Sequence, residues 1–233
     1  MVTTGEIITT LGLVSRTALV AGATGLVGSH VLDQLLADAA WSHVVTVGRR
    51  SAPIRQDKLE QRIVDLGALE AVADLPHADD VFCCLGTTIK QAGSQAAFRR
   101  VDDEFVLNLA RAGLRIGAKQ FLLVSAIGAN PQSRVFYSRV KGEVEAAVRK
   151  LPYRAVQIFR PGLLLGERHE FRLGERIFMI AAPLIQLLLV SRLRRYRSIK
   201  ASDVARAMVG IAREAPRGPN VFEYDAMVAS LAA

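Results

Sequence analysis

Three side chains have the types and spacing needed for acid–base chemistry at a carbonyl group. Tyr137 and Lys141 stand four residues apart in a stretch with a helical pattern, so they would share one helix face. A lysine ammonium would bring the pKa of the phenol down from about 10 towards the working pH, as a proton donor requires. Ser125 ends an apolar run twelve residues earlier, and its hydroxyl could hold the carbonyl oxygen. We predict catalytic roles for all three, although the Tyr–Lys spacing alone would equally fit two surface residues.

A glycine-rich turn lies between an apolar β-branched run and a helical pattern, at residues 21–28. Its glycines are spaced three apart, a GxxGxxG variant of the dinucleotide fingerprint, which permits a tight turn, close approach of the pyrophosphate and tight helix packing. The start of the helix would add free N–H groups and a positive dipole end for phosphates. The alternative is a purely structural turn. The predicted cofactor-binding residues are Gly22, Thr24, Gly25, Leu26, Val27 and Gly28.

A pair of arginines indicates which dinucleotide binds. Residues 47–50 read Val-Gly-Arg-Arg, at the end of the second predicted strand, where an NAD site would place an Asp or Glu on the ribose hydroxyl. A guanidinium matches a 2′-phosphate, which a carboxylate would repel. Arg49 and Arg50 therefore predict NADPH over NADH, the alternative being two solvated loop arginines.

Two further strand ends are assigned to the adenosine by position only. Asp65, followed by Leu66, could accept a hydrogen bond from the adenine amino group. Leu85 and Gly86 follow the fourth predicted strand, where adenosine passes the sheet edge, and Gly86 would permit close backbone approach.

The elements that must position these residues alternate in type. Short apolar, β-branched runs indicate strands at 17–21, 44–47, 63–64, 81–84, 121–124 and 155–159. Helical patterns lie between most of them, at 26–36, 98–116 and 135–151. This order predicts an α/β fold, a doubly wound Rossmann-type parallel sheet with helices on both faces and a small C-terminal lobe.

We expect a single NAD(P)-binding domain spanning residues 1–233. Residues 1–15 would be an N-terminal extension. Residues 161–233, which include a helix at about 202–214, would form a small substrate or partner lobe integrated with the domain, over the carboxyl edges of the strands.

Composition excludes several classes of protein. The 233 residues are 51% hydrophobic and 22% charged, as in globular rather than disordered chains. The net charge of +8 is spread along the chain apart from a basic cluster at 192–197, so we predict no specific nucleic-acid partner. The two cysteines are adjacent, which excludes a disulfide framework and a CxxC metal site. No secretory signal precedes the domain, and we expect a cytoplasmic protein.

An apolar stretch at 177–190 is too short to span a bilayer, which takes about 20 residues. We expect it to be buried against the sheet or a partner. The alternative is a weak membrane-surface contact through 177–197, because the basic cluster follows it directly.

The order of glycine turn, strand-end serine and helical YxxxK resembles the short-chain dehydrogenase/reductase superfamily. Segments 82–88, 140–145 and 159–164, and the Gly-Arg-Arg turn at 48–50, are similar to its Tat-interacting-protein-like atypical members, over about residues 16–215. The resemblance implies a Rossmann fold, NADPH on the glycine turn, and a Ser-Tyr-Lys set here at Ser125, Tyr137 and Lys141. It also implies that Lys141 holds the nicotinamide ribose. The residues implied beside the nicotinamide carboxamide are Pro161, Gly162 and Leu163.

These features together predict an NADPH-dependent oxidoreductase that reduces a small-molecule substrate, a small or apolar carbonyl compound. Apolar residues of the C-terminal lobe suggest that substrate class, the alternative being that they belong to the core: Phe171, Phe178, Met179 and Leu187. The alternative is a non-catalytic NADPH-binding sensor or regulator that acts through a partner, since some relatives are described as regulators. Superfamily members also dimerise through paired helices, which makes helices 98–116 and 134–151 candidates for a homodimer interface.

Overall fold

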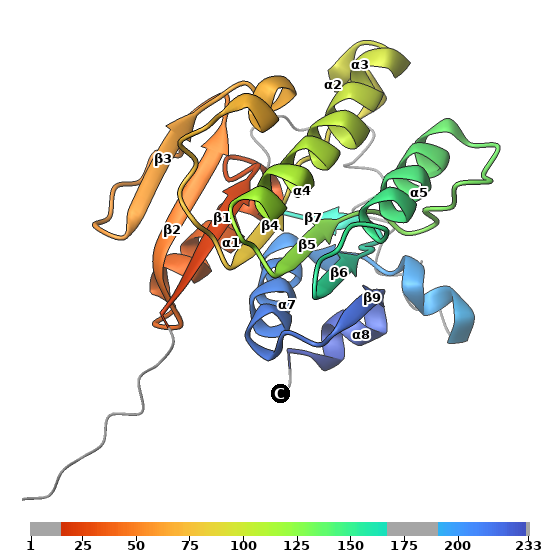
Figure 1. The fold of residues 1–233 in the computed structure, drawn as a ribbon. Helices are drawn as coiled ribbons and strands as arrows, with labels where there is room; N and C mark the ends of the chain where they lie inside the picture. The colour runs from red at the N-terminus through yellow and green to blue at the C-terminus, as the bar shows by residue number, and fades with distance from the viewer. Residues whose placement is uncertain (1–14, 167–190, 232–233) are drawn as a thin grey trace, which may run out of the picture.

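The computed structural model describes residues 15–166 and 191–231, which build a seven-stranded parallel sheet between two layers of helices (Figure 1). The strand order is β3-β2-β1-β4-β5-β6-β9, a doubly wound arrangement in which the order reverses beside β1. The strands are β1 (Arg16–Ala21), β2 (Trp41–Gly48), β3 (Leu59–Ile63), β4 (Asp80–Cys83), β5 (Gln120–Val124), β6 (Ala155–Phe159) and β9 (Gly218–Phe222). A separate pair of short parallel strands joins β7 (Leu164–Leu165) to β8 (Ile199–Lys200).

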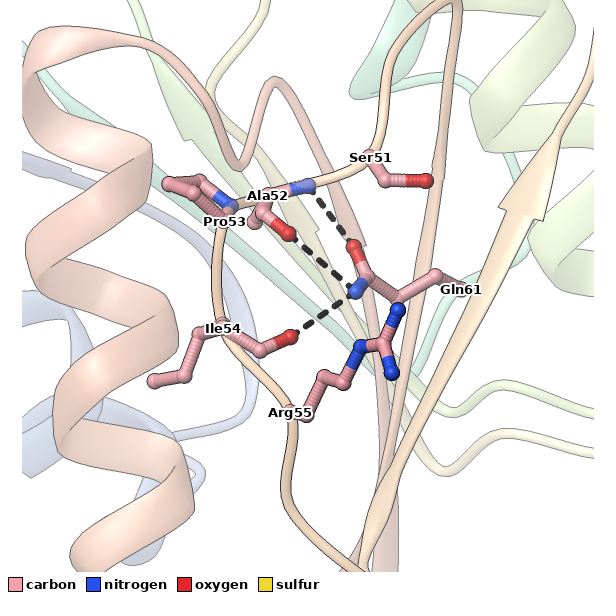
Figure 2. Close-up of a pocket in the computed structure, with 6 residues that line it drawn as sticks. All are labelled: Ser51, Ala52, Pro53, Ile54, Arg55 and Gln61. Carbon is pink, nitrogen blue, oxygen red and sulfur yellow. Dashed lines mark hydrogen bonds between the residues drawn. The ribbon is translucent and has the colours of Figure 1, made fainter.

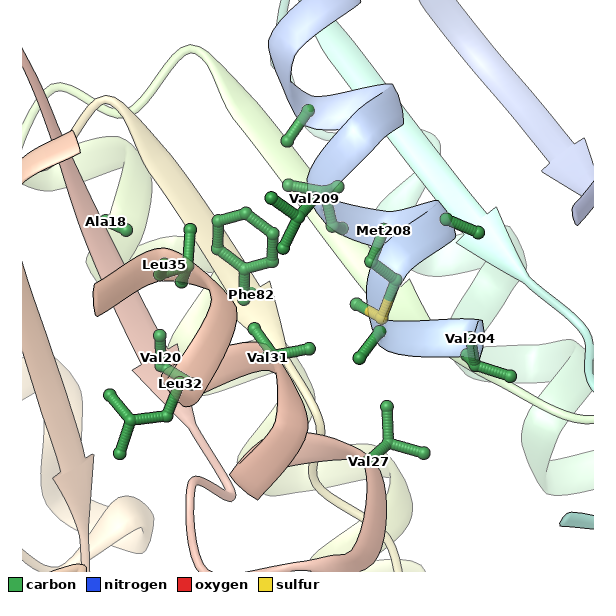
Figure 3. Packing of buried hydrophobic residues seen from close by; sticks show 14 of the residues in the cluster. Ala18, Val20, Val27, Val31, Leu32, Leu35, Phe82, Val204, Met208 and Val209 are labelled. Atoms are coloured by element: carbon green, nitrogen blue, oxygen red, sulfur yellow. The ribbon is translucent and has the colours of Figure 1, made fainter. Parts of the chain in front are cut away.

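Successive side chains of a strand point to opposite faces of the sheet, and the buried strands carry apolar side chains on both faces. Both faces are therefore covered by helices. On one face α1 (Leu26–Ala37) packs against α7 (Ala201–Glu214), with Phe82 of β4 between them (Figure 3). The other face packs against α4 (Phe105–Arg115) and α5 (Phe136–Val148). The remaining helical pieces are η1 (Leu66–Ala71), α2 (Ile89–Ala92), α3 (Gln95–Arg99), η2 (Arg100–Glu104), η3 (Ser191–Tyr196) and α8 (Tyr224–Ala229).

The predicted α/β fold is confirmed, and all six predicted strands are present with ends shifted by up to four residues. The helix predicted at 98–116 is instead three pieces, because α3 passes through the π-helical turn η2 before α4 begins. Strand β9 was not predicted. Its Gly-Pro start hides the strand pattern, and Pro219 is tolerated because β9 lies at the sheet edge.

The C-terminal segment shares the sheet and the core. Strand β9 pairs with β6, and α7 packs on α1. Within the described ranges, no helix is long and apolar enough to cross a membrane. The apolar stretch 177–190 lies outside the described residues, as do the four apolar lobe residues Phe171, Phe178, Met179 and Leu187.

The amino ends of the central strands are joined by a buried polar cluster around Asp80, at the edge opposite the predicted site. Trp41 Nε1 and Gln120 Nε2 donate to its carboxylate over 2.8 Å and 2.9 Å, and Arg16 forms an ion pair with it. Burial raises the pKa of Asp80, against the opposing effect of the Arg16 charge.

We expect Asp80→Ala to lower the free energy of unfolding by about 3–5 kcal/mol, because breaking a buried ion pair leaves its partner unpaired. Urea denaturation measures this loss. The matched control is Asp74→Ala, which breaks an exposed pair with Arg62 and should change stability by less than about 1 kcal/mol. Equal losses in the two variants would contradict the role given to Asp80.

Candidate active site

The glycine turn between β1 and α1 is packed too tightly for larger side chains at Gly22 and Gly28. Gly22 has a φ of +82°, and a Cβ at Gly28 would lie 2.0 Å from the Gly22 carbonyl oxygen. The Gly25 N–H donates to that same oxygen over 2.9 Å, which closes the turn. Gly25 is also the N-cap of α1 and has no side chain to offer the first-turn N–H groups, so they are available to an anion.

The other predicted residues of this turn differ in how far they are exposed to solvent. Thr24 and Gly25 are exposed, and Leu26 is half-buried at the helix start. Val27 is 6% exposed and packs in the core between α1 and α7. Gly166, at the end of β7, approaches closely, because a Cβ there would lie 2.6 Å from Leu26 Cδ1. The turn follows the last residue of β1 and so lies at the carboxyl edge of the sheet.

The residues predicted to bind the 2′-phosphate and the adenosine follow strands β2, β3 and β4 at this edge. Arg49 and Arg50 follow β2 directly and are exposed. Asp65 caps η1 by accepting from the Gly67 N–H over 2.9 Å. Of the remaining residues assigned to the adenosine, two are buried in the core and one is exposed: Leu66, Leu85 and Gly86.

Lys141 is held by a carboxylate that the sequence analysis missed. Its Nζ lies 2.8 Å from Oδ1 of Asp102, and both side chains are buried. Asp102 sits in the π-helical turn η2 and also accepts from the Thr87 N–H over 2.9 Å. A Cβ at Gly86 would lie 3.6 Å from Asp102 Oδ1 and 3.9 Å from Lys141 Nζ, so the ion pair lies directly beside this exposed glycine.

The charge of Lys141 is stable at neutral pH. Burial by itself lowers the pKa of Lys141, but the Asp102 carboxylate and the Tyr137 phenol act in the opposite direction, and the pKa is raised overall. Lys141 can therefore donate hydrogen bonds and supply positive charge, whereas it cannot serve as a base at neutral pH.

Ser125 is hydrogen-bonded to the buried carboxylate of a second ion pair, which also escaped sequence reasoning. Its hydroxyl donates to Oε1 of Glu145 over 2.6 Å. Arg160 donates to both oxygens of this carboxylate, from Nε over 3.0 Å and from Nη2 over 2.5 Å. Because the Ser125 proton points at Glu145, its oxygen is left as a hydrogen-bond acceptor. The expected donor role of Ser125 would require its hydroxyl to turn away from Glu145.

Helix α5 brings these groups together. Tyr137, Lys141 and Glu145 follow one another at intervals of four residues, so they share one helix face. Tyr137 is half-buried, and its ring packs against Phe98 of α3 with the centroids 5.4 Å apart. The repeated interval was a signal for Glu145 in the sequence, whereas nothing local pointed to Asp102 or Phe98.

The segment implied to lie beside the nicotinamide leaves β6 at the same edge. The Pro161 carbonyl accepts from the Ile127 N–H over 2.9 Å. A Cβ at Gly162 would lie 2.7 Å from the Arg197 carbonyl oxygen, so only glycine allows the two backbones to pass this closely. Leu163 is 40% exposed. The predicted cofactor and catalytic residues thus come from elements that end at one edge of the sheet.

Comparison with known proteins identifies relatives of this chain. A family model described as NAD(P)H-binding matches residues 22–161. Protein HTATIP2 of Rattus norvegicus is 38% identical over 165 residues, which cover 69% of this chain and 68% of that protein. Protein FMP52, mitochondrial, of Coccidioides immitis is 31% identical over 215 residues, which cover 87% of each chain.

Solved structures confirm the fold at low sequence identity. UDP-glucose 4-epimerase of Thermotoga maritima superposes with a TM-score of 0.65 at 18% identity, covering 89% of this chain and 77% of that chain. MoeE5 in complex with UDP-glucuronic acid and NAD gives a TM-score of 0.67 at 21% identity, covering 88% and 75%.

The expected cytoplasmic location is wrong. The fungal relatives from Coccidioides immitis, Emericella nidulans and Candida glabrata are all named mitochondrial. The expectation relied on the lack of a secretory signal, and that feature says nothing about other compartments.

Proposed function

The chain belongs to the NAD(P)H-binding family, and we propose that it is an NADPH-dependent oxidoreductase that reduces a small or apolar carbonyl compound. The resemblance to Tat-interacting-protein-like proteins is confirmed by the rat relative. A nicotinamide cofactor follows from the family. The choice of NADPH, the reaction and the substrate class are the proposal.

One observation carries the catalytic part of the proposal: the buried Lys141–Asp102 ion pair lies one helical turn from Tyr137 and beside Gly86. Burying an ammonium group is unfavourable unless a partner compensates it. Asp102 is that partner, and it fixes the Lys141 ammonium beside Gly86, in the segment that follows β4. A fixed positive charge one helical turn from Tyr137 would stabilise negative charge that forms on the phenol oxygen as its proton passes to the substrate.

The residues of the glycine turn fit a dinucleotide, because the exposed N-cap Gly25 offers no side chain to the first-turn N–H groups of α1 and leaves them available to a phosphate. NADPH, when bound, supplies a hydride to the carbonyl carbon. Tyr137 donates its phenol proton to the carbonyl oxygen, and Lys141 stabilises the phenolate that remains. Ser125, whose proton is bound to Glu145, accepts a hydrogen bond from the hydroxyl of the alcohol product. The carbonyl thereby gains one hydride and one proton.

The apolar part of the proposed substrate is supported by two exposed apolar side chains, one of them two residues before Tyr137. Val135 is the N-cap of α5 and is 62% exposed, and Leu163 is 40% exposed after β6. A panel of aldehydes and ketones tests the reaction, with the absorbance of the reduced nicotinamide as the readout. We expect apolar carbonyls to consume NADPH. Binding of NADPH without consumption across the panel would contradict the reductase and favour the regulatory alternative.

The preference for NADPH is tested at Arg49. Arg49→Ala should weaken NADPH binding by about 10–100-fold, because hydrogen bonds between charged groups contribute about 1.5–3 kcal/mol. NADH, which has no 2′-phosphate, should bind the variant as it binds the wild type. Calorimetric titration at fixed salt measures both.

The control for this test is Arg206→Ala, which removes the same charge from an exposed position on α7. It separates contact with the phosphate from general attraction between a basic protein and an anion. If both arginine variants lose the same affinity for NADPH, Arg49 does not recognise the phosphate.

A further inference from the structure

The connection between β2 and β3 begins with the two arginines and contains no helix. Residues 49–58 return from the carboxyl end of β2 to the amino end of β3 as irregular chain. Parallel strands are usually joined through a helix, whose backbone groups satisfy one another. An irregular connection must find partners for its N–H and C=O groups elsewhere, or it is not fixed in one conformation.

Gln61 provides those partners from β3 (Figure 2). Its Oε1 accepts from the Ala52 N–H over 2.7 Å. Its Nε2 donates to the Ala52 carbonyl over 3.2 Å and to the Ile54 carbonyl over 3.0 Å. Both ends of one side-chain amide therefore bind a single short segment, 52–54, which lies two residues after Arg50.

The same segment is held from a second side. Ala52 is buried and Ile54 partly buried in the core beside α1. Further along, Lys58 Nζ donates to three carbonyls at the C-terminal end of α1 and the start of β2. A cavity of about 470 Å³ remains between the connection and β3. It is lined by Ser51, Ala52, Pro53, Ile54, Arg55 and Gln61.

We propose that Gln61 is a positioning residue for cofactor choice: by fixing segment 52–54 it holds Arg49 and Arg50 ready for the 2′-phosphate of NADPH. This inference rests on the proposed preference for NADPH. Gln61 need not touch the cofactor, because ordering the connection before binding removes an entropy loss that binding would otherwise incur. NADH makes no contact that depends on those guanidinium groups, so its affinity does not depend on Gln61.

The test compares Gln61→Met with Gln56→Met in calorimetric titrations of the full chain with NADPH and with NADH. Gln56 is exposed in the same connection, so its variant makes the matched change outside the hydrogen-bonded segment. We expect Gln61→Met to weaken NADPH binding by about five- to tenfold, roughly one lost hydrogen bond or more, and NADH binding by less than about twofold. Gln56→Met should change neither affinity.

A purely structural role would reduce both affinities equally, and that result would overturn the proposal, as would no change in either. Gln61→Glu gives a second variant in case the methionine disturbs folding: it keeps the acceptor for Ala52 but loses both donors. It should shift the NADPH/NADH ratio in the same direction.

The outcome also separates this inference from the proposed function. Wild-type protein that binds neither nucleotide overturns both. A preference for NADPH that Arg49→Ala removes and both Gln61 variants retain overturns only the role of Gln61.

Discussion

Gly28→Ala is expected to weaken the binding of NADPH and NADH by about 100-fold or more, which corresponds to a loss of about 2.8 kcal/mol. A Cβ at this position would lie 2.0 Å from the Gly22 carbonyl oxygen and 2.7 Å from its carbon. These atoms are backbone, so neither can move without opening the turn. The Gly25 N–H donates to the same oxygen, and displacing that oxygen would therefore move the N-cap of α1 as well. Calorimetric titration measures the loss.

A second helical glycine provides the matched control for this substitution. A Cβ at Gly210 of α7 would meet no atom within 4 Å. Gly210→Ala should leave both affinities unchanged and raise stability by about 0.5–1 kcal/mol, since alanine favours a helix over glycine. Wild-type affinity in Gly28→Ala protein with native stability would show that the turn does not hold the dinucleotide.

Tyr137→Phe is expected to lower kcat for carbonyl reduction by about 10²–10⁴-fold, the usual contribution of general acid catalysis. The substitution removes only the phenol hydroxyl. The ring remains in contact with Phe98, and Lys141 remains paired with Asp102. NADPH affinity should therefore change by less than about threefold, equivalent to less than one ordinary hydrogen bond. Steady-state kinetics with an accepted carbonyl and a parallel titration measure the two effects.

Tyr153→Phe is the control for loss of a phenol away from the site. The Tyr153 hydroxyl donates to the Ala110 carbonyl of α4, and the side chain packs in the core on that face of the sheet. Its loss should lower stability without changing kcat. Turnover by Tyr137→Phe at the wild-type rate would exclude Tyr137 as the proton donor, whatever the stability of the variant.

The sequence predicted the parts of this fold that local signals specify. Short apolar, β-branched runs predicted six strands, and the spacing of three glycines predicted the turn that contains Gly22 and Gly28. These predictions succeeded because each depends on neighbouring residues. The spacing of apolar residues three and four apart, which indicates a helix, is also a local signal. The ends of α1 and α5 were therefore predicted to within a few residues.

The parts that escaped prediction depend on contacts between distant residues. Asp102 and Lys141 lie 39 positions apart, and no spacing rule connects an acid in a π-helical turn with a lysine on α5, beyond α4 and β5. Ser125 was predicted as a donor to substrate, whereas its partner Glu145 was assigned no role. A helical pattern also cannot show where a turn widens from α to π, so η2 was read as continuous helix.

The most direct test of a dinucleotide phosphate site is a calorimetric titration of the intact wild-type chain with NADPH and, at the same moderate salt, with NADH. The glycine turn and the uncapped start of α1 predict saturable binding of both, and the arginines after β2 predict that NADPH binds at least about tenfold more tightly. Saturable NADPH binding with this preference would support the cofactor, the site and the role of the Arg49–Arg50 pair together. If neither nucleotide binds at millimolar concentration, the glycine turn is purely structural and the proposed reductase is wrong.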